Sequence, residues 1–324
     1  MFKAILLQQV EKKTCAELLD LDDTNLPTVD TIVKISHSTI NYKDALAITG
    51  KAPVVRKFPM VPGIDFAGVV ESTSSDRLSV GDRVVLTGWG HGETEWGGLS
   101  ERAAVKAERL IKLPDNLCNL DAMRIGTAGF TAMLCVEALS KAIKSGEEVL
   151  VTGANGGVGG FSVALLAARG FRVTASTGRS EESDRLKKLG ASNVISRSEL
   201  STLGKPLQKE RWGGAVDTVG SHTLANVCAS LSYGGAVAAC GMAQGIDFPA
   251  TVAPFILRGI MLLGIDSVYA PSDVREHVWS LLANELPQNV LSEMTSEIGL
   301  PEVIPAAQRL LEGGVAGRLV VCMD

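Results

Sequence analysis

A glycine-dense turn between two apolar runs constrains this chain more than any other stretch. Residues 149–151 form a short apolar run of the kind a buried parallel strand shows, and residues 171–175 form a second one. Between them lie the turn and an apolar helical segment that Gly170 ends. The turn glycines are Gly153, Gly156, Gly157, Gly159 and Gly160. This order predicts a strand, a turn, a helix and a second strand.

The spacing within the turn, Gly-x-x-Gly-Gly-x-Gly, favours a dinucleotide site over an ordinary tight turn. Glycines let the backbone approach a pyrophosphate closely, and the N-terminus of the following helix stabilises the negative charge. The flanking strands and the helix supply the context that such a site needs. We expect cofactor contacts from Asn155, Gly156, Gly157 and Val158.

The end of the second apolar run indicates which cofactor binds. An NAD-specific site places Asp or Glu about twenty residues after the glycines, where it bonds the ribose 2′-hydroxyl. This chain has Ser176, Thr177, Gly178 and Arg179 there. Hydroxyls and an arginine suit a 2′-phosphate, and no carboxylate stands among them to repel it. We therefore predict NADPH, with a solvated loop as the alternative interpretation of Arg179.

Length and composition predict a soluble chain of two domains. The 324 residues exceed the usual single-domain size, and the net charge of −5 provides no basic field for nucleic acid. No run approaches the length of a membrane span, and the N-terminal apolar run is too short for a signal peptide. Six scattered cysteines without a C-x-x-C pair indicate reduced thiols. We expect a cytoplasmic protein without nucleic-acid or membrane partners.

The pattern of predicted secondary structure changes near residue 122. Before it, short strand candidates separated by Asp, Pro and Gly predict a β-rich, barrel-like or sandwich domain. After it, strands and helices alternate, which predicts an α/β domain with a doubly wound parallel sheet. The last helix and strand candidates are expected to return to the first domain. We therefore predict one domain at 1–122 with a return segment at 294–324, and a second at 123–293.

Several motifs spread over nearly the whole chain carry a family likeness. They are NYKDALAITG at 41–50, PGIDFAG at 62–68, LTGWG at 86–90, GTAGFTA at 126–132, YGG at 233–235 and PFILR at 254–258. With the glycine turn, they resemble the zinc-independent, quinone oxidoreductase branch of the medium-chain dehydrogenase/reductase family, and within it the NADPH-dependent acrylyl-CoA reductases. The resemblance implies reduction of acrylyl-CoA to propionyl-CoA. It also implies a GroES-like first domain, a Rossmann second domain, and a homodimer joined through the edge strand near 260–268.

Sister enzymes in this family hold a catalytic zinc through Cys and His. Here the 41–44 segment occupies the expected cysteine position, and Ile64 stands where the histidine would be. The four histidines show no mutual metal-ligand spacing, whereas a catalytic zinc needs three protein ligands. We therefore predict that the protein uses no zinc.

Reduction of an activated double bond without a metal needs hydrogen-bond donors and positive charge near the developing enolate. The candidate catalytic residues are Asn41, Tyr42, Lys43, Asp44 and Asp65. Asn41 and Tyr42 can donate hydrogen bonds, Lys43 can bring positive charge, and the aspartates can orient water or a neighbouring side chain. The resemblance places Tyr42 beside the nicotinamide as well. For each polar residue, a structural hydrogen bond or salt bridge is the alternative.

Further cofactor contacts are expected outside the turn. The candidates are Thr127, Thr131, Arg197, Gly241 and Arg318. Thr127 and Thr131 lie in GTAGFTA, which resembles the nicotinamide-facing start of a helix, with tight packing as the alternative. Arg197 follows the third strand candidate of the second domain, and Arg318 opens the last one of the chain.

A basic stretch, GKAPVVRKF at 50–58, follows the proposed active-site segment. Its proline and glycine favour a loop, and Lys51, Arg56 and Lys57 are candidates for binding the phosphates of coenzyme A. A solvated basic loop is the alternative. Trp89 stands in a loop rich in glycine and aromatics and is a candidate for the substrate mouth.

Three functions fit these observations: an acrylyl-CoA reductase, a quinone or small-enone reductase, and a non-catalytic NADPH-binding sensor or scaffold. The polar 41–44 segment argues against the third, because a scaffold has no use for it. The size of the substrate separates the first two, since coenzyme A carries a phosphate-rich handle that quinones lack.

Overall fold

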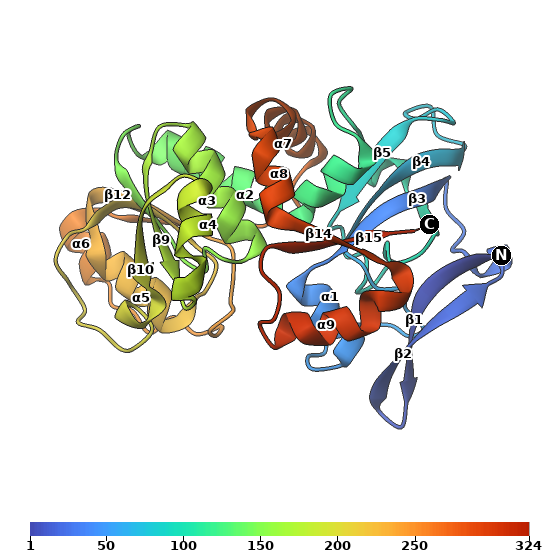
Figure 1. The fold of residues 1–324 in the computed structure, drawn as a ribbon, viewed down its shortest axis with the longest axis horizontal. Coiled ribbons are helices and arrows are strands. Elements are labelled where there is room, and N and C mark those ends of the chain that lie inside the picture. Colours follow the sequence, from blue (N-terminus) through green and yellow to red (C-terminus); the bar gives the residue numbers. More distant parts are fainter. Residues whose placement is uncertain (324) are drawn as a thin grey trace. The chain divides into compact units, whose positions relative to one another are not determined.

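The structure is a computed structural model that describes residues 1–323, apart from the side chain of Gln288 (Figure 1). The chain forms two compact units. The first comprises Met1–Thr127, Ser267–Ala283 and the residues from Met294 on, and the second comprises Ala128–Asp266 and Asn284–Glu293. The predicted domains differ from these units at 123–127 and at 267–283, which group with the first unit rather than with the second.

The first unit is built on a seven-stranded sheet and a separate hairpin. Its elements are β1 (Phe2–Val10), β2 (Lys13–Leu21), β3 (Thr31–Ile40), α1 (Tyr42–Thr49), β4 (Asp65–Thr73), β5 (Arg83–Thr87), β6 (Arg102–Val105), β7 (Ile111–Lys112), α7 (Ser272–Glu285), β14 (Thr295–Gly299), α9 (Val303–Leu311) and β15 (Arg318–Cys322). The strand order is β14-β15-β3-β4-β5-β7, and β6 also pairs with β3. Because β15 runs antiparallel to β3, with Leu319 opposite Ile40, Arg318 arrives next to the end of β3.

The core of the first unit is formed by alternate residues of its strands, as expected where one face of a sheet is turned inward. Val33 and Ile35 of β3 belong to one buried cluster with Val84 and Leu86 of β5. Val303 of α9 belongs to the same cluster. The last segment therefore contributes α9 to the core of the first unit and β15 to its sheet.

The second unit is a doubly wound parallel sheet. Its elements are β8 (Glu148–Val151), α3 (Gly157–Ala168), β9 (Arg172–Thr177), α4 (Ser183–Lys188), β10 (Ala191–Ser196), β11 (Trp212–Asp217), α5 (Ser221–Ser230), β12 (Leu231–Ala239), α6 (Ala253–Arg258), β13 (Met261–Gly264) and α8 (Gln288–Met294). The order is β10-β9-β8-β11-β12-β13, with every pair parallel. α3 packs on β8 and β9, and α5 on β11 and β12 (Figure 1). The predicted combination of a β-rich domain and a doubly wound α/β domain is confirmed.

One long helix, α2 (Asn119–Ala142), begins in the first unit and continues in the second. Gly126 interrupts it with φ 49° and ψ −158°, so two helical segments meet at a kink. By length and composition α2 could cross a membrane, which corrects the expectation that no run is long enough. However, 72 % of its apolar window is buried inside the protein, as in the core helix of a soluble protein.

Candidate active site

A buried polar network in the first unit surrounds Asp65, the first residue of β4. The Asp65 carboxylate accepts hydrogen bonds from Thr39 Oγ1 at 2.5 Å and from Asn41 Nδ2 at 3.0 Å. It also accepts the backbone N–H of Thr127 at 2.8 Å. Asp65 is fully buried, so these donors replace the water that its charge has lost. The network joins the end of β3, the start of β4 and the kink of α2.

Arg318 adds the positive charge of this network. Its Nη1 donates to Asn41 Oδ1 at 3.2 Å, and its Nη2 donates to Thr39 Oγ1 at 3.1 Å and lies 3.8 Å from Asp65 Oδ2. Burial lowers the pKa of Arg318, while the charges of Asp65 and Asp44 act in the opposite direction. The Nε of Arg318 is buried without an acceptor within residues 1–323. The structure thus places this predicted cofactor residue among the predicted catalytic ones.

Asp44 is a second buried carboxylate, in the first turn of α1. It accepts the backbone N–H of Asn41 at 2.8 Å, Asn41 Nδ2 at 3.2 Å and the backbone N–H of Ile64 at 3.0 Å. Burial, and then the charge of Asp65, raise the pKa of Asp44 to about 7. Asp44 therefore fixes the start of α1 against the residue that precedes Asp65, and it orients the amide of Asn41.

Gly126 explains part of the GTAGFTA motif. Its φ of +49° is a left-handed conformation that favours glycine. A Cβ at this position would lie 2.2 Å from Arg318 Nη2 and 2.9 Å from Asp65 Oδ2. Only a residue without a side chain lets the helix kink approach the charged network and present the Thr127 N–H to Asp65.

Tyr42 and Lys43 lie outside the buried network. Tyr42, the first residue of α1, is 54 % exposed, so its ring is accessible to a ligand. Lys43 forms an ion pair with Glu93, and both side chains are partly buried. The positive charge that we expected Lys43 to bring is thus compensated by a residue that the sequence did not single out.

The glycine turn has the geometry of a nucleotide site. Gly156 precedes α3, and a Cβ at Gly159 would lie 2.3 Å from the carbonyl oxygen of Gly153, so the helix and the turn meet without side chains between them. Asn155 is held from two sides. Its Nδ2 donates to Thr177 Oγ1 at 2.7 Å, and its carbonyl oxygen accepts from Arg185 Nη2 at 3.2 Å.

The residues after β9 are arranged differently from the simplest expectation. Ser176 and Thr177 are buried, and the Thr177 hydroxyl is engaged by Asn155 and by the backbone N–H of Arg179 at 3.0 Å. The exposed Arg197 lies across Gly178, where a Cβ would come 2.4 Å from its Nε. The structure thus brings Gly178, Arg179 and Arg197 together at the surface and turns the two hydroxyl residues inward.

Other predicted residues lie in both units. In the second, Thr131 is buried in α2, and a Cβ at Gly241 would lie 2.2 Å from the Thr218 carbonyl oxygen. In the first, the side chains of Lys51, Arg56 and Lys57 are exposed and form no ion pair or side-chain hydrogen bond within residues 1–323. The Arg56 backbone N–H donates to the Glu93 carbonyl oxygen at 2.9 Å, which ties the basic loop to the partner of Lys43.

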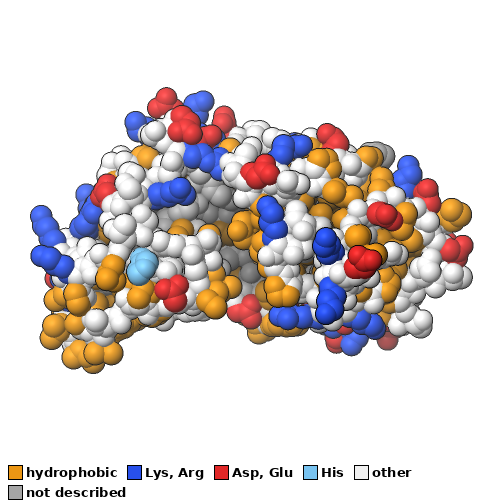
Figure 2. All heavy atoms as spheres, turned by 90° about the horizontal axis from the view of Figure 1, so that it is seen from below, with side chains coloured by type: hydrophobic (Ala, Val, Ile, Leu, Met, Phe, Trp, Pro, Cys, Tyr) orange, Lys and Arg blue, Asp and Glu red, His pale blue; other side chains and the backbone are white. Residues whose placement is uncertain are grey.

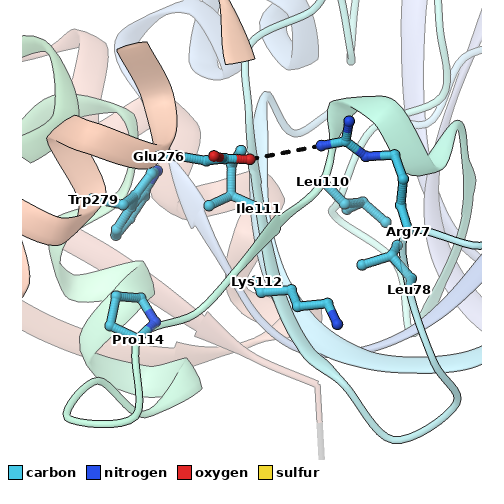
Figure 3. Close-up of a pocket in the computed structure, with 8 residues that line it drawn as sticks. All are labelled: Arg77, Leu78, Leu110, Ile111, Lys112, Pro114, Glu276 and Trp279. Carbon is cyan, nitrogen blue, oxygen red and sulfur yellow. Dashed lines mark ion pairs between the residues drawn. The ribbon is translucent and has the colours of Figure 1, made fainter. Parts of the chain in front are cut away.

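The first unit also has a surface cavity that the sequence did not indicate. Its volume is about 230 Å³, and Figure 3 shows Arg77 and Glu276 pointing toward one another beside Trp279. Arg77 and Glu276 are 3.6 Å apart, and Lys112 at the rim pairs with Asp82 at 2.7 Å. Because its cations are already paired and none of its lining residues joins the Asp65 network, we assign it no role. Within the described part of the chain, no group of three or more His, Cys, Asp or Glu is placed to hold a metal ion.

Known proteins share both units. Residues 27–115 match the alcohol dehydrogenase GroES-like domain, and residues 157–284 match the zinc-binding dehydrogenase domain. With the full-length relatives described next, these matches show that the chain belongs to the medium-chain dehydrogenase/reductase family of oxidoreductases. The predicted family, the GroES-like domain and the Rossmann domain are confirmed.

Three bacterial relatives match over the full length. Acrylyl-CoA reductase AcuI of Ruegeria pomeroyi is 47 % identical, with 99 % of both chains covered. A crystal structure of Escherichia coli K-12 YhdH with bound NADPH is 47 % identical, with a TM-score of 0.97 and coverage of 99 % of this chain and 100 % of that one. Putative quinone oxidoreductase YhfP of Bacillus subtilis is 44 % identical over 99 % of this chain and 98 % of that protein. It was solved with NAD bound, with a TM-score of 0.95 and 99 % of both chains covered.

Proposed function

We propose that this protein reduces the activated C=C bond of acrylyl-CoA to propionyl-CoA with NADPH. The observation that carries the proposal is the full-length likeness to a protein named acrylyl-CoA reductase, in a chain that also has the buried Asn41–Asp65–Arg318 network. In this reaction a hydride goes to the β-carbon and a proton to the α-carbon, and the negative charge of the enolate needs donors at the thioester oxygen.

NADPH fits the second unit. When bound, it supplies the hydride, and the protein supplies position and charge. The turn residues Asn155–Val158 would hold the pyrophosphate, and Arg179 with Arg197 would meet the 2′-phosphate. Glu182, the nearby acid, pairs with Arg185 at 2.9 Å, so its negative charge is compensated. Because one relative was solved with NAD bound, the rates with NADPH and NADH should be compared directly. We expect NADPH to be preferred.

In the first unit, Tyr42 is the proposed donor to the thioester oxygen, because the Asp44 and Asp65 carboxylates already accept from the side-chain amide nitrogen of Asn41. Asn41 is fixed by Asp44, Asp65 and Arg318, so its orientation is set before substrate binds. The exposed Tyr42 ring is available to both substrate and nicotinamide.

We propose that no zinc takes part, and prolonged dialysis against a chelator should leave the rate unchanged. Stoichiometric zinc whose removal abolishes activity would contradict this.

The basic loop supports coenzyme A as the handle of the substrate. Lys51, Arg56 and Lys57 are exposed on a net acidic protein, and we propose that they bind the coenzyme A phosphates. Replacing Arg56 and Lys57 together by alanine should lower kcat/KM for acrylyl-CoA roughly tenfold, about 1.4 kcal/mol, and leave a small enone unaffected. The matched control removes two exposed lysines of the second unit, Lys141 and Lys144. Equal losses on both substrates, or no loss, would exclude the binding of coenzyme A phosphates by this loop.

A quinone or small-enone reductase is the second candidate, favoured by the name of the Bacillus subtilis relative. Initial rates with NADPH on acrylyl-CoA, crotonyl-CoA and a quinone separate the two. We expect acrylyl-CoA to give the highest kcat/KM, and a clear preference for the quinone would overturn the proposed substrate. We also infer a cytoplasmic location, which agrees with six cysteines that are all free thiols.

We further propose a homodimer joined through β13, the last strand of the second unit's sheet. Met261 and Leu262 of β13 are 37 % and 38 % exposed, and Ile256 and Leu257 of α6 are 77 % and 63 % exposed. Figure 2 shows hydrophobic side chains gathered on the part of the molecule that carries α6. An exposed apolar edge strand favours pairing with a second copy. Leu262→Lys should convert the dimer to a monomer in light scattering, and an unchanged mass would contradict the proposed interface.

A further inference from the structure

Arg275 of α7 is a buried arginine that the proposed reaction does not use. Its side chain is 1 % exposed, and it is among the largest fully buried side chains in the structure. A buried charge costs free energy unless hydrogen bonds replace its water. Burying Arg275 therefore costs free energy that its hydrogen bonds must offset, and these hydrogen bonds show which segments it joins.

The guanidinium of Arg275 joins two segments. Nη1 donates to the carbonyl oxygen and to Oγ1 of Thr87, both at 2.7 Å, at the end of β5. Nη2 donates to the carbonyl oxygens of Ser267 at 3.0 Å and Val268 at 2.8 Å, and Nε donates to that of Ala270 at 2.9 Å. The fixed fork of an arginine reaches all of these acceptors, which the single ammonium of a lysine cannot.

The turn that Arg275 holds is strained. Gly88, Trp89 and Gly90 have φ of 76°, 56° and 76°, and the left-handed region is unfavourable for a tryptophan. Such a conformation persists where its surroundings determine it. Here the Arg275 guanidinium lies 4.7 Å from the centre of the Trp89 ring, and the backbone N–H of Trp89 donates to the Val268 carbonyl oxygen at 2.9 Å.

Trp89 is connected to the proposed active site by hydrogen bonds. The Gly88 N–H donates to the Ile64 carbonyl oxygen at 2.9 Å, and the Ile64 N–H donates to Asp44 at 3.0 Å. Trp89 packs edge-to-face on Tyr269, with ring centres 6.4 Å apart, and Tyr269 is 62 % exposed. The turn that carries Trp89 thus follows directly on Thr87, which pairs with Asp65 at the start of β4.

We propose that Arg275 is a positioning residue that holds Trp89 and Tyr269 as a preformed aromatic wall for the acyl end of the substrate. This rests on the proposed function and on the prediction from the sequence that Trp89 lines the substrate mouth. A wall fixed before binding lowers the ordering cost of substrate binding. Loss of this wall is expected to raise KM more than it lowers kcat. The affinity for NADPH should not change, because the proposed NADPH site is in the second unit.

The test is a double-mutant cycle between Arg275→Lys and Trp89→Ala. Arg275→Lys should lower kcat/KM for acrylyl-CoA roughly tenfold, about 1.4 kcal/mol, mainly through KM, with NADPH binding unchanged. In the Trp89→Ala background the same substitution should change kcat/KM by less than about twofold. Independent, additive losses would overturn the proposal. A lower Tm with unchanged kcat/KM would also overturn it, because Arg275 would then only stabilise the fold.

Two further variants keep the test decisive. If Arg275→Lys does not fold, as judged by lost NADPH binding, Thr87→Val removes one acceptor only, and its loss of kcat/KM, roughly threefold, should vanish in the Trp89→Ala background. The control is Arg169→Lys in the second unit, where Arg169 pairs with Glu137 at 2.6 Å and Glu285 at 2.8 Å. It should lower Tm without changing kcat/KM.

Failure of the proposed function is recognised separately. If the unaltered protein reduces a quinone or enone but not acrylyl-CoA, the proposed substrate is wrong. The same cycle is then measured with the substrate that is reduced. Coupling between Arg275 and Trp89 still supports the positioning role, and additivity still overturns it.

Discussion

Both units bury an aspartate, but they stabilise it in different ways. Asp65 in the first unit receives side-chain donors and lies near a guanidinium, with Arg318 Nη2 3.8 Å from its Oδ2. Asp217 in the second accepts Thr152 Oγ1 at 2.7 Å and the backbone N–H groups of Val219 at 3.2 Å and Gly220 at 2.7 Å. Burial raises the pKa of Asp217.

The difference concerns where the partners come from. Val219 and Gly220 follow Asp217 directly, so a turn of the backbone supplies most of what that carboxylate needs. The partners of Asp65 stand at 39, 41, 127 and 318 in the sequence. Asp65 therefore depends on partners distant in the sequence, one of them a cation, and Asp217 depends mainly on local backbone geometry. Substitutions can test that contrast directly.

Removing the cation of the first unit should have the largest effect. Arg318→Leu leaves Asp44 and Asp65 buried without their guanidinium and should lower the free energy of unfolding by about 3–5 kcal/mol. Urea unfolding measures it. Asp217→Asn, which removes a carboxylate served by neutral donors, should cost about 1–2 kcal/mol. Equal costs for the two variants would contradict the distinction between the units.

Blocking the close approach of α3 to the glycine turn in the second unit should have the next largest effect. A Cβ at Gly159 would lie 2.3 Å from the Gly153 carbonyl oxygen, so Gly159→Ala must displace the turn from the helix. We expect NADPH affinity to fall by about a hundredfold, roughly 2.7 kcal/mol, as measured by calorimetry. A variant that binds NADPH normally would show that the turn does not depend on this contact.

Removing a positive charge at the surface of the nucleotide site should have a somewhat smaller effect on NADPH affinity. Arg179→Ala removes a proposed contact to the 2′-phosphate and should weaken NADPH binding roughly ten- to thirtyfold, about 1.5–2 kcal/mol. NADH, which lacks that phosphate, serves as the internal control and should bind as before. Equal use of both cofactors by the unaltered protein would refute the predicted preference.

The smallest effect should come from pH. The pKa of Asp44 is about 7 in the folded protein against an ordinary 3.8, so between these values the folded state holds a proton that the unfolded state releases. Asp44 therefore stabilises the fold fully below the lower value, and this contribution is lost as pH rises through the upper one. From about pH 5 to pH 6, the free energy of unfolding should fall by roughly 1.3 kcal/mol more in the unaltered protein than in Asp44→Asn. An identical pH dependence in both would show that Asp44 does not titrate there.

The sequence predicted the second unit better than the first because its signals are local. The glycine turn, its strands and its helix lie within about thirty residues, and each element is specified by its own pattern. The inward placement of Thr177 was not predictable, since it depends on Asn155, 22 residues away.

In the first unit the motifs indicated the right segment but not its partners. The Lys43–Glu93 ion pair spans 50 residues, and Arg275 reaches Thr87 across 188. Neither Glu93 nor Arg275 stands in a motif. The packing of helices and loops against the sheet creates these contacts, and a pattern along the chain does not indicate which distant side chain will be brought there.

The pairing of β15 with β3 has a consequence for synthesis on the ribosome. Asp44 and Asp65 emerge early, whereas Arg318 is made 253 residues after Asp65, counted from positions 65 and 318. At about 5–20 residues per second, the two carboxylates wait roughly 13–50 s for their cation. Most of the second unit, Ala128–Asp266, is contiguous and can fold during that interval. The unit whose strands are translated first is thus the last to be completed.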